Sequence, residues 1–556
     1  MKHSGLSLTL PDFSRRSLLR LAMAGTAVPL LGPASARGQS RPPSKPTGQV
    51  IAGISQEPTV FNPLLLHIEV DEGVYMNLFS PLWSVDPDGK FVPELAAEVP
   101  TLANGGISAD GTQWRIKLRS GVSWHDGAPF TSEDVKYTLD LINDHNFPAF
   151  SRAGHELVRD ITLVSPTEIA WRMEKPFAPY LSILAWWMFI VPKHILEKEA
   201  DPQKSKFAAA PVGTGPFRWS ERVPGDHITL VANEKFYGTG PHIERLVFKY
   251  IPDLTVLFTQ FRTGDIDYIG LQGISADHYA EARSLPDRTV VLAPQSSIET
   301  FDFNLARPQF KDLAVRKALY LSTDKDTIIK DVYYGLPSPA ESFLPSQSWA
   351  FNPDLPKHEY DPDKARMLLD EAGWKPGGDG IRVKDGVRLE FTTSTTAGNH
   401  LREQVQQVLQ QGWHDIGAKV AIKNLPPAVM WGDYWMKSQF DTGMAGIDFM
   451  SGPDPEVSDY FRSTSTPVKG GSGQNTFQYV NPEADALLQQ GSTALDRSAR
   501  VPIYQKIQAI VRRDLPFLPL FQYVFVEGTK ARLVGYKPNV NVRSNCWNIR
   551  TWYWTT

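Results

Sequence analysis

The sequence has little cysteine, little net charge and no long apolar run beyond its first residues. Cys546 is the single cysteine among 556 residues, which excludes an internal disulfide and a cysteine-based zinc cluster. The net charge of -4 removes the basic footprint that nucleic-acid binding needs. No apolar run after residue 36 reaches the roughly 20 residues of a membrane-spanning helix. The sequence therefore predicts neither a nucleic-acid-binding protein nor a membrane-spanning one.

The composition is that of a folded protein with more than one domain. Hydrophobic residues make up 42% and charged residues 21% of the chain, as in ordinary globular proteins. At roughly 100–200 residues per domain, the length suits two or three domains.

The first 36 residues have the layout of an export signal. A basic start, which includes Arg15 and Arg16, precedes a short apolar stretch at residues 21–31, and Ala34-Ser35-Ala36 follows as a cleavage site. The paired arginines look like a bacterial twin-arginine signal. No cysteine follows that could carry a lipid. We therefore predict cleavage after Ala36 and a soluble, monomeric protein in the periplasm. The alternative is a basic helix that is retained.

Strand and helix patterns alternate along the rest of the chain. Apolar residues at every second position predict strands, and apolar residues three and four apart predict helices. The strands are expected at residues 114–118, 246–251 and 389–393, and the helices at 365–372, 401–416 and 501–511. This alternation predicts an α/β protein with more than one sheet.

Motifs of common enzymes are missing. The chain has no Gly-x-Ser-x-Gly elbow, no phosphate-binding loop and no His-Glu-x-x-His zinc motif. Its 12 histidines are scattered, and Gly238-Thr239-Gly240 lacks the third glycine of a dinucleotide loop. The sequence therefore predicts no catalytic residue, no metal site and no cofactor, and favours an exported binding protein. An exported α/β hydrolase whose site is assembled from distant residues is the alternative of another class.

Several motifs, in order, resemble the periplasmic solute-binding proteins of peptide, dipeptide and nickel ABC transporters. A match along most of residues 50–530 identifies the family better than any single motif. The matching segments are 79–82, Asp86-Pro87-Asp88-Gly89, 93–96, 110–135, Gly213-Thr214-Gly215-Pro216-Phe217, 233–238, 314–319 and 360–365. The motifs themselves have structural roles: Asp110-Gly111 predicts a hairpin turn, Thr131 a helix cap, and residues 213–216 a tight crossing between lobes.

The resemblance implies an α/β periplasmic-binding-protein fold with two lobes, a hinge and an extra inserted subdomain. Lobe I would comprise residues 37–80, 210–296 and 525–556, the inserted subdomain residues 81–209, and lobe II residues 297–524. It also implies the substrate-binding component of an ABC importer, which captures peptides of two or more residues between its lobes and delivers them to a membrane permease. Closure of the lobes would bury the ligand, and the ligand's higher affinity for the closed form would supply the energy of the change.

The resemblance also implies where the ligand binds. In peptide-binding members a carboxylate on the second lobe pairs with the peptide's α-ammonium, and neighbouring strands pair with its main chain. Asp448 is the matching candidate, with Met444, Gly446, Ile447 and Phe449 beside it. A tryptophan and two further residues usually precede the acid, whereas here Ile447 precedes Asp448 directly. The alternative is an aspartate that caps a loop at the end of a strand.

On the first lobe, the resemblance places Glu69 and Val70 on a strand that runs along the ligand.

Trp413, Trp431 and Trp435 could line a cavity, but their spacing favours packing against the lobe that contains them.

The ligand itself stays open at this point. An opine, an oligosaccharide or a metal chelate would suit the same class of protein, and a chaperone or signalling receptor could use the same fold. Some oligopeptide binders also carry a basic residue where Met444 stands. This departure and the one at Ile447 keep the alternatives in place.

Overall fold

The computed structural model describes residues 41–555, apart from residues 66, 187, 200, 202–205, 427–428, 451 and 472. The chain divides into two units, Met1–Arg41 and Pro42–Thr556, and all the helices and strands described below belong to the second. The predicted export signal at residues 1–36 lies outside the described residues. Within the described part of the chain, no helix combines the length and the apolar character that a membrane crossing requires.

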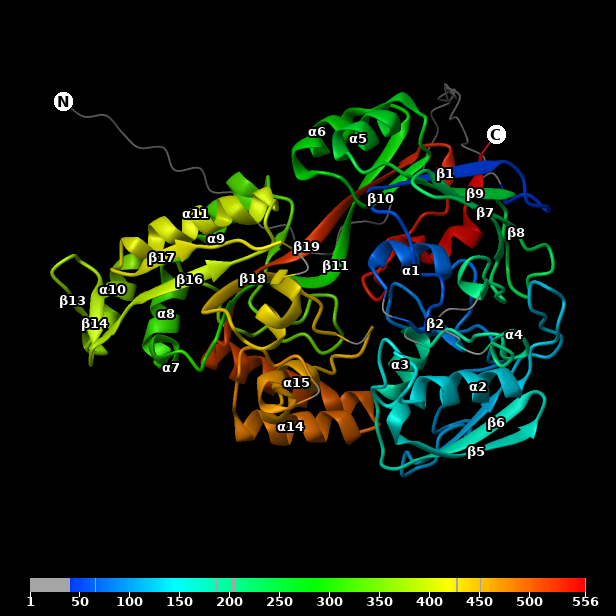
Figure 1. Ribbon diagram of the computed structural model, residues 1–556, viewed down its shortest axis with the longest axis horizontal. Helices are drawn as coiled ribbons and strands as arrows, with labels where there is room; N and C mark the ends of the chain where they lie inside the picture. The colour runs from blue at the N-terminus through cyan, green and yellow to red at the C-terminus, as the bar shows by residue number, and fades with distance from the viewer. Residues whose placement is uncertain are drawn as a thin grey trace, which may run out of the picture. The chain divides into compact units, whose positions relative to one another are not determined.

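One mixed sheet runs through the second unit (Figure 1). Its strands follow the order β17-β16-β18-β11-β19-β10-β1-β9-β8-β7, with β12 beside β19. Their bounds are β1 Gln49–Ile54, β7 Phe217–Val223, β8 His227–Ala232, β9 Arg245–Tyr250, β10 Tyr268–Ile274, β11 Arg288–Phe303, β12 Ser338–Pro339, β16 Glu390–Ser394, β17 Lys419–Ile422, β18 Thr442–Ile447 and β19 Phe517–Lys530. The predicted strands at 246–251 and 389–393 are β9 and β16.

The two longest strands, β11 and β19, lie side by side in the middle of the sheet. They pair with each other antiparallel, β19 pairs with β10 on one side, and β11 pairs with β18 on the other. The register of β11 against β19 shifts between Pro294 and Ile298, which marks a bulge in β11. The predicted lobe boundaries at 296/297 and 524/525 fall within these strands. The division into lobes at those residues stays a prediction.

The helices include the three that the sequence predicts. The three predicted helices are confirmed as α10, α11 and α15, and Gly373 follows α10 with a φ of 87°. The helices are α1 Glu69–Tyr75, α2 Ser132–Asn143, α3 Tyr180–Trp186, α4 Lys193–Leu196, α5 Leu254–Thr263, α6 Tyr279–Ser284, α7 Pro308–Lys311, α8 Leu313–Leu321, α9 Lys325–Thr327, α10 Pro362–Glu371, α11 His400–His414, α13 Ser458–Phe461, α14 Pro482–Thr493 and α15 Arg497–Asp514.

Small sheets complete the architecture. Residues 81–209 contain β4-β6-β5 and the pair β2-β3, and the predicted strand at 114–118 is β4. The buried core of this segment is continuous with that of β1, β8 and β9. The bounds are β2 Trp83–Val85, β3 Phe91–Pro93, β4 Gln113–Lys117, β5 Val158–Ser165, β6 Glu168–Met173, β13 Lys375–Pro376, β14 Arg382–Lys384, β15 Val387–Arg388, β20 Leu533–Val534 and β21 Tyr553–Trp554.

Two of the recognised motifs do what their residues predict. Asp110-Gly111 forms a turn with a φ of 71° at Gly111, a conformation that glycine adopts without strain. Thr131 caps α2, because its hydroxyl accepts from the backbone N–H of Glu133 at 3.3 Å. The carboxylate of Asp134 accepts in turn from the N–H of Thr131 at 2.9 Å and completes a capping box.

The glycines at 213 and 215 make a tight crossing with Leu78, and its place between lobes stays a prediction. The N–H of Gly215 donates to the carbonyl of Leu78 at 2.8 Å, and a Cβ on Gly213 would lie 1.8 Å from that same oxygen. Leu78 and Gly213 both fall in the part of the chain predicted as lobe I. The crossing brings Leu78 and residues 213–215 together, because the backbone can approach this closely only where residues 213 and 215 carry no Cβ.

Residues 81–209 also contact the part of the chain predicted as lobe II. The N–H of Ala178 donates to the carbonyl of Ser492 in α14 at 2.8 Å. A Cβ on Gly452 would lie 2.8 Å from the ring of Trp186, and one on Gly111 would lie 2.9 Å from Leu495. These contacts tie residues 81–209 to the loop after β18, to α14 and to the chain that follows α14.

Candidate ligand-binding site

A cavity of about 1010 Å³ lies where the lobes and residues 81–209 meet. Its wall comes from the start of α1, from residues 149–157 and 175–186, from the bulge of β11, from the loop after β18, from α14 and from the C-terminal segment. This is the upper end of the size range for ligand cavities. The bulge residues Gln295, Ser296 and Ser297 form part of the wall.

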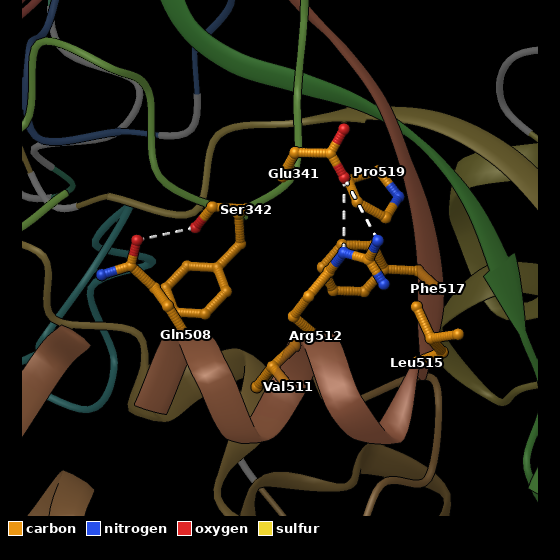
Figure 2. A pocket seen from close by; sticks show the side chains of 9 residues that line it. Glu341, Ser342, Gln508, Val511, Arg512, Leu515, Phe517 and Pro519 are labelled. Carbon is orange, nitrogen blue, oxygen red and sulfur yellow. Dashed lines mark hydrogen bonds and ion pairs between the residues drawn. The ribbon is translucent and has the colours of Figure 1, made fainter. Parts of the chain in front are cut away.

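A separate hollow between α15 and the chain that follows β12 is much too small to hold a ligand. It has a volume of about 10 Å³, roughly the space that one water molecule needs. Figure 2 shows Glu341 above Arg512, whose guanidinium lies 3.3 Å from the carboxylate, and Ser342 turned to Gln508 at 2.9 Å. These pairs fix the chain that follows β12 to α15, which is a structural role.

Asp448 lies in the cavity wall, directly after β18. Its Oδ1 is buried and accepts no hydrogen bond, while its backbone carbonyl accepts from the hydroxyl of Tyr460 at 3.1 Å. Burial raises the pKa of Asp448, and Arg543 and a hydrogen bond from Ser296 oppose that shift. The side chain is thus a buried acid with one oxygen available to a ligand.

Glu69 also lines the cavity, but on a helix and not on the predicted strand. The carboxylate of Asp71 accepts from the N–H groups of Thr59 at 2.6 Å, Val60 at 3.0 Å and Ile68 at 2.9 Å. These bonds satisfy donors at the start of α1 and hold residues 59–60 against it, so the chain turns into a helix here.

The environment of Glu69 disfavours its ionised form. Burial raises the pKa of Glu69 to about 8; the carboxylates of Glu72, Glu527 and Asp448 add to the shift, and Arg543 opposes it. Its Oε1 is buried and accepts no hydrogen bond. The carboxylate of Glu527 is satisfied separately, by Tyr268 at 3.1 Å, Tyr536 at 2.5 Å and Asn545 at 3.2 Å.

Arg543 and Glu72 complete a charge cluster that the sequence did not reveal. Arg543 lines the cavity, and its Nη1 lies 3.9 Å from Oε2 of Glu72. Burial would lower the pKa of Arg543, but Glu72, Glu69 and Asp448 together raise it. Glu72 is 1% exposed; its Oε1 accepts from the indole of Trp186 at 3.3 Å, and burial raises its pKa. We refer to Glu69, Glu72, Asp448 and Arg543 as the acidic cluster.

The other predicted site residues divide into two groups. Gly446 and Phe449 line the cavity with Asp448 and Glu69. Met444 and Val70 are buried in the hydrophobic cores of the two lobes, and Ile447 packs on the side of β18 away from Gly446. A Cβ on Gly446 would lie 2.7 Å from the ring of Tyr523, so this position has no room for a side chain.

The three tryptophans are not part of the cavity wall as the structure describes it. Trp413 is fully buried in the core of the second lobe, as its place on the face of a helix predicts. Trp431 and Trp435 pack on each other at 5.2 Å between ring centroids. The packing interpretation is therefore confirmed for Trp413 and Trp435, whereas Trp431 packs on Trp435 and is partly exposed, at 39%.

The acidic cluster is suited to a positively charged group. A buried carboxylate that lacks a partner carries a large desolvation cost, and an ammonium or guanidinium group from a ligand would remove that cost. Among the described residues, no group of three or more histidine, cysteine, aspartate or glutamate side chains could hold a metal ion.

Comparison with known proteins gives the family. Residues 90–467 match the family described as bacterial extracellular solute-binding proteins, family 5 Middle. The chain is 28% identical over 519 residues to the oligopeptide-binding protein AppA of Bacillus subtilis, and the match covers 91% of each chain. The structure of that AppA in complex with a nonapeptide matches with a TM-score of 0.77 at 27% identity, over 92% of this chain and 100% of AppA.

A second solved structure shares the fold at a similar level. NikZ from Campylobacter jejuni, in complex with Ni(L-His), matches with a TM-score of 0.78 at 26% identity, over 91% of this chain and 99% of NikZ. The two-lobed α/β fold predicted from the sequence motifs is thus confirmed. The chain belongs to family 5 of the bacterial extracellular solute-binding proteins.

Proposed function

We propose that this protein is the substrate-binding component of an ABC importer and that it binds peptides in the cavity between its lobes. It delivers the loaded form to a membrane permease and transforms nothing itself. It is exported through a twin-arginine signal, is cleaved after Ala36, and works as a monomer in the periplasm. The similarity to AppA, an oligopeptide-binding protein solved in complex with a nonapeptide, supports the choice of peptides.

One observation carries the proposal: Asp448 presents a buried carboxylate oxygen without a partner to the cavity. The α-ammonium of a peptide would donate to this oxygen, and the peptide's main chain would pair with β18 beyond Gly443, where the pairing of β18 with β16 ends. Pairing through the main chain tolerates many side chains, which is what a general peptide importer requires.

A second candidate ligand is a metal chelate, which the similarity to NikZ with Ni(L-His) favours. The two candidates differ at Asp448. A peptide needs this carboxylate for its ammonium group, whereas a chelate that carries its own metal ligands needs it only if it presents a free amine.

Thermal melts distinguish the ligands. We would refold residues 37–556 after denaturation to remove any bound ligand and then add peptide pools, opines, oligosaccharides or metal chelates. A ligand at 100 times its Kd stabilises by about 2.7 kcal/mol, which raises Tm by a few degrees. A shift with peptides alone supports the proposal, and a shift with chelates alone overturns the choice of peptides.

Two matched variants test the role of Asp448. Asp448→Asn removes the charge but keeps the shape, and we expect it to weaken peptide binding at least 30-fold, as for the loss of one partner of a buried ion pair. Asp433→Asn, whose side chain pairs with Lys437 on the surface of the same lobe, removes the same charge as a control. Equal affinities for both variants in isothermal titration calorimetry would contradict the ammonium role.

A further inference from the structure

The charges that line the cavity are balanced everywhere except at the acidic cluster. Away from the cluster, the wall carries three acids and three bases: Glu156, Glu456 and Asp459 against Arg152, Lys175 and Arg462. In the cluster, Glu69, Glu72 and Asp448 face a single base, Arg543. When all groups are ionised, this end of the cavity therefore has an excess of two negative charges.

Arg543 is already engaged with the acid that lies behind the wall. Glu72 does not line the cavity, is 1% exposed, and lies 3.9 Å from Arg543. His67, 3.9 Å from the same carboxylate, does not compensate it, because burial lowers the pKa of His67 to about 4 and keeps the ring neutral. The two acids that remain, Glu69 and Asp448, are those that line the cavity.

Glu69 and Asp448 come from opposite lobes, from α1 and from the end of β18, and each has a buried oxygen that accepts no hydrogen bond. A single α-ammonium compensates one negative charge and leaves the other. We propose that the second charge is met by the ligand as well: the site selects peptides whose first residue has a basic side chain, with the α-ammonium at Asp448 and the side-chain cation at Glu69. This inference rests on the proposed function and adds a specificity to it.

The chemistry of Glu69 fits a selective role. With a neutral first residue, Glu69 retains a proton, because its buried carboxylate has no cation to pair with. With a lysine or arginine there, the side-chain cation pairs with the ionised carboxylate, and the pair is shielded from solvent. The selection is therefore for the charge of the first residue and not for its length or apolar bulk.

Three tripeptides test the inference on the unmodified protein. Lys-Ala-Ala and norleucine-Ala-Ala differ mainly in the side-chain ammonium of the first residue, and Ala-Ala-Lys places the same charge at the other end. We expect isothermal titration calorimetry at pH 7 to give Lys-Ala-Ala at least tenfold tighter binding than either of the others. Equal binding of the lysine-first and norleucine-first peptides, or equal preference for Ala-Ala-Lys, would overturn the inference but not the proposed function.

Glu69→Gln assigns the preference to its residue. In this variant we expect Lys-Ala-Ala and norleucine-Ala-Ala to bind within threefold of each other. The control, Glu281→Gln, removes a surface carboxylate that pairs with Arg262 and should keep the full preference. A preference that survives Glu69→Gln would overturn the role of Glu69, and a failure of all three peptides to bind the unmodified protein would overturn both proposals.

Discussion

Replacing Glu69 by glutamine should make the ligand-free protein more stable, although the change removes a residue of the site. Burial raises the pKa of Glu69 to about 8, whereas the same group in an unfolded chain has its ordinary pKa of 4.5. Below pH 4.5 both forms hold the proton, and the carboxylate costs nothing. As the pH rises from 4.5 to 8, the unfolded chain loses its proton first, so the folded state loses stability. Glutamine does not titrate and avoids this loss.

The size of the effect follows from the difference between the two pKa values. One pH unit between them corresponds to about 1.4 kcal/mol, so the loss is about 1 kcal/mol at pH 5 and about 3 kcal/mol at pH 7. Unfolding a chain of about 500 ordered residues carries an entropy of roughly 1 kcal/mol per degree. Glu69→Gln should therefore raise Tm by about 1 °C at pH 5 and by about 3 °C at pH 7.

Melts of the ligand-free protein and of Glu69→Gln at half-unit steps from pH 4.5 to 8 measure this gap. Other titrating groups affect both proteins alike, so the difference in Tm isolates Glu69. Glu281→Gln, on the surface of α6, should show no such gap. A difference in Tm that stays constant from pH 5 to 8, or a variant that is less stable at pH 7, would refute the reasoning.

Three further substitutions test the supports of the site. Arg500→Met should lower the free energy of unfolding by about 3–5 kcal/mol in denaturant titrations, because the buried carboxylate of Asp454 loses its two hydrogen bonds, at 2.6 and 2.7 Å, from Arg500. The double variant Arg500→Met with Asp454→Leu should lose less stability, because no unpaired charge is left buried. An equal loss in both variants would contradict this reasoning. Gly446→Ala should lower Tm by forcing Tyr523 aside, at about 1–3 kcal/mol. Thr131→Ala should cost about 1 kcal/mol, and Thr131→Ser should restore it.

Local patterns in the sequence predicted the parts of the fold that depend on local physics. Apolar residues three and four apart placed α10, α11 and α15 nearly at their observed bounds, and alternation placed β4, β9 and β16. The order of the motifs, through their resemblance to a family, supplied the two-lobed arrangement. Periodicity alone could not have supplied it, because lobes joined by long crossing strands pair residues hundreds of positions apart.

The site was predicted in part, and the errors have physical causes. Asp448 was chosen by resemblance, and the structure places it in the cavity wall. The segment around Glu69 was expected to be a strand. The hydrogen bonds that the carboxylate of Asp71 accepts from residues 59–60 favour a helix here, and no pattern in the sequence reveals them. Arg543 was missed because it is 95 positions after Asp448 and belongs to a segment without a motif. The sequence shows only an arginine near the C-terminus, and a lone arginine is too common to indicate a ligand-binding residue.

The bulge of β11 affects both the bending of the long strands and the shape of the cavity wall. Gln295, Ser296 and Ser297 interrupt the register of the two strands that cross between the lobes, and the same three residues form part of the cavity wall. A mutation that reshapes the wall here also changes the angle at which the strands bend. A substitution at these positions would therefore change ligand preference and the geometry of closure together. In a biosensor built on this protein, new ligand specificity should be introduced in α1 and in the loop after β18, because substitutions there leave the bend of β11 and β19 unchanged.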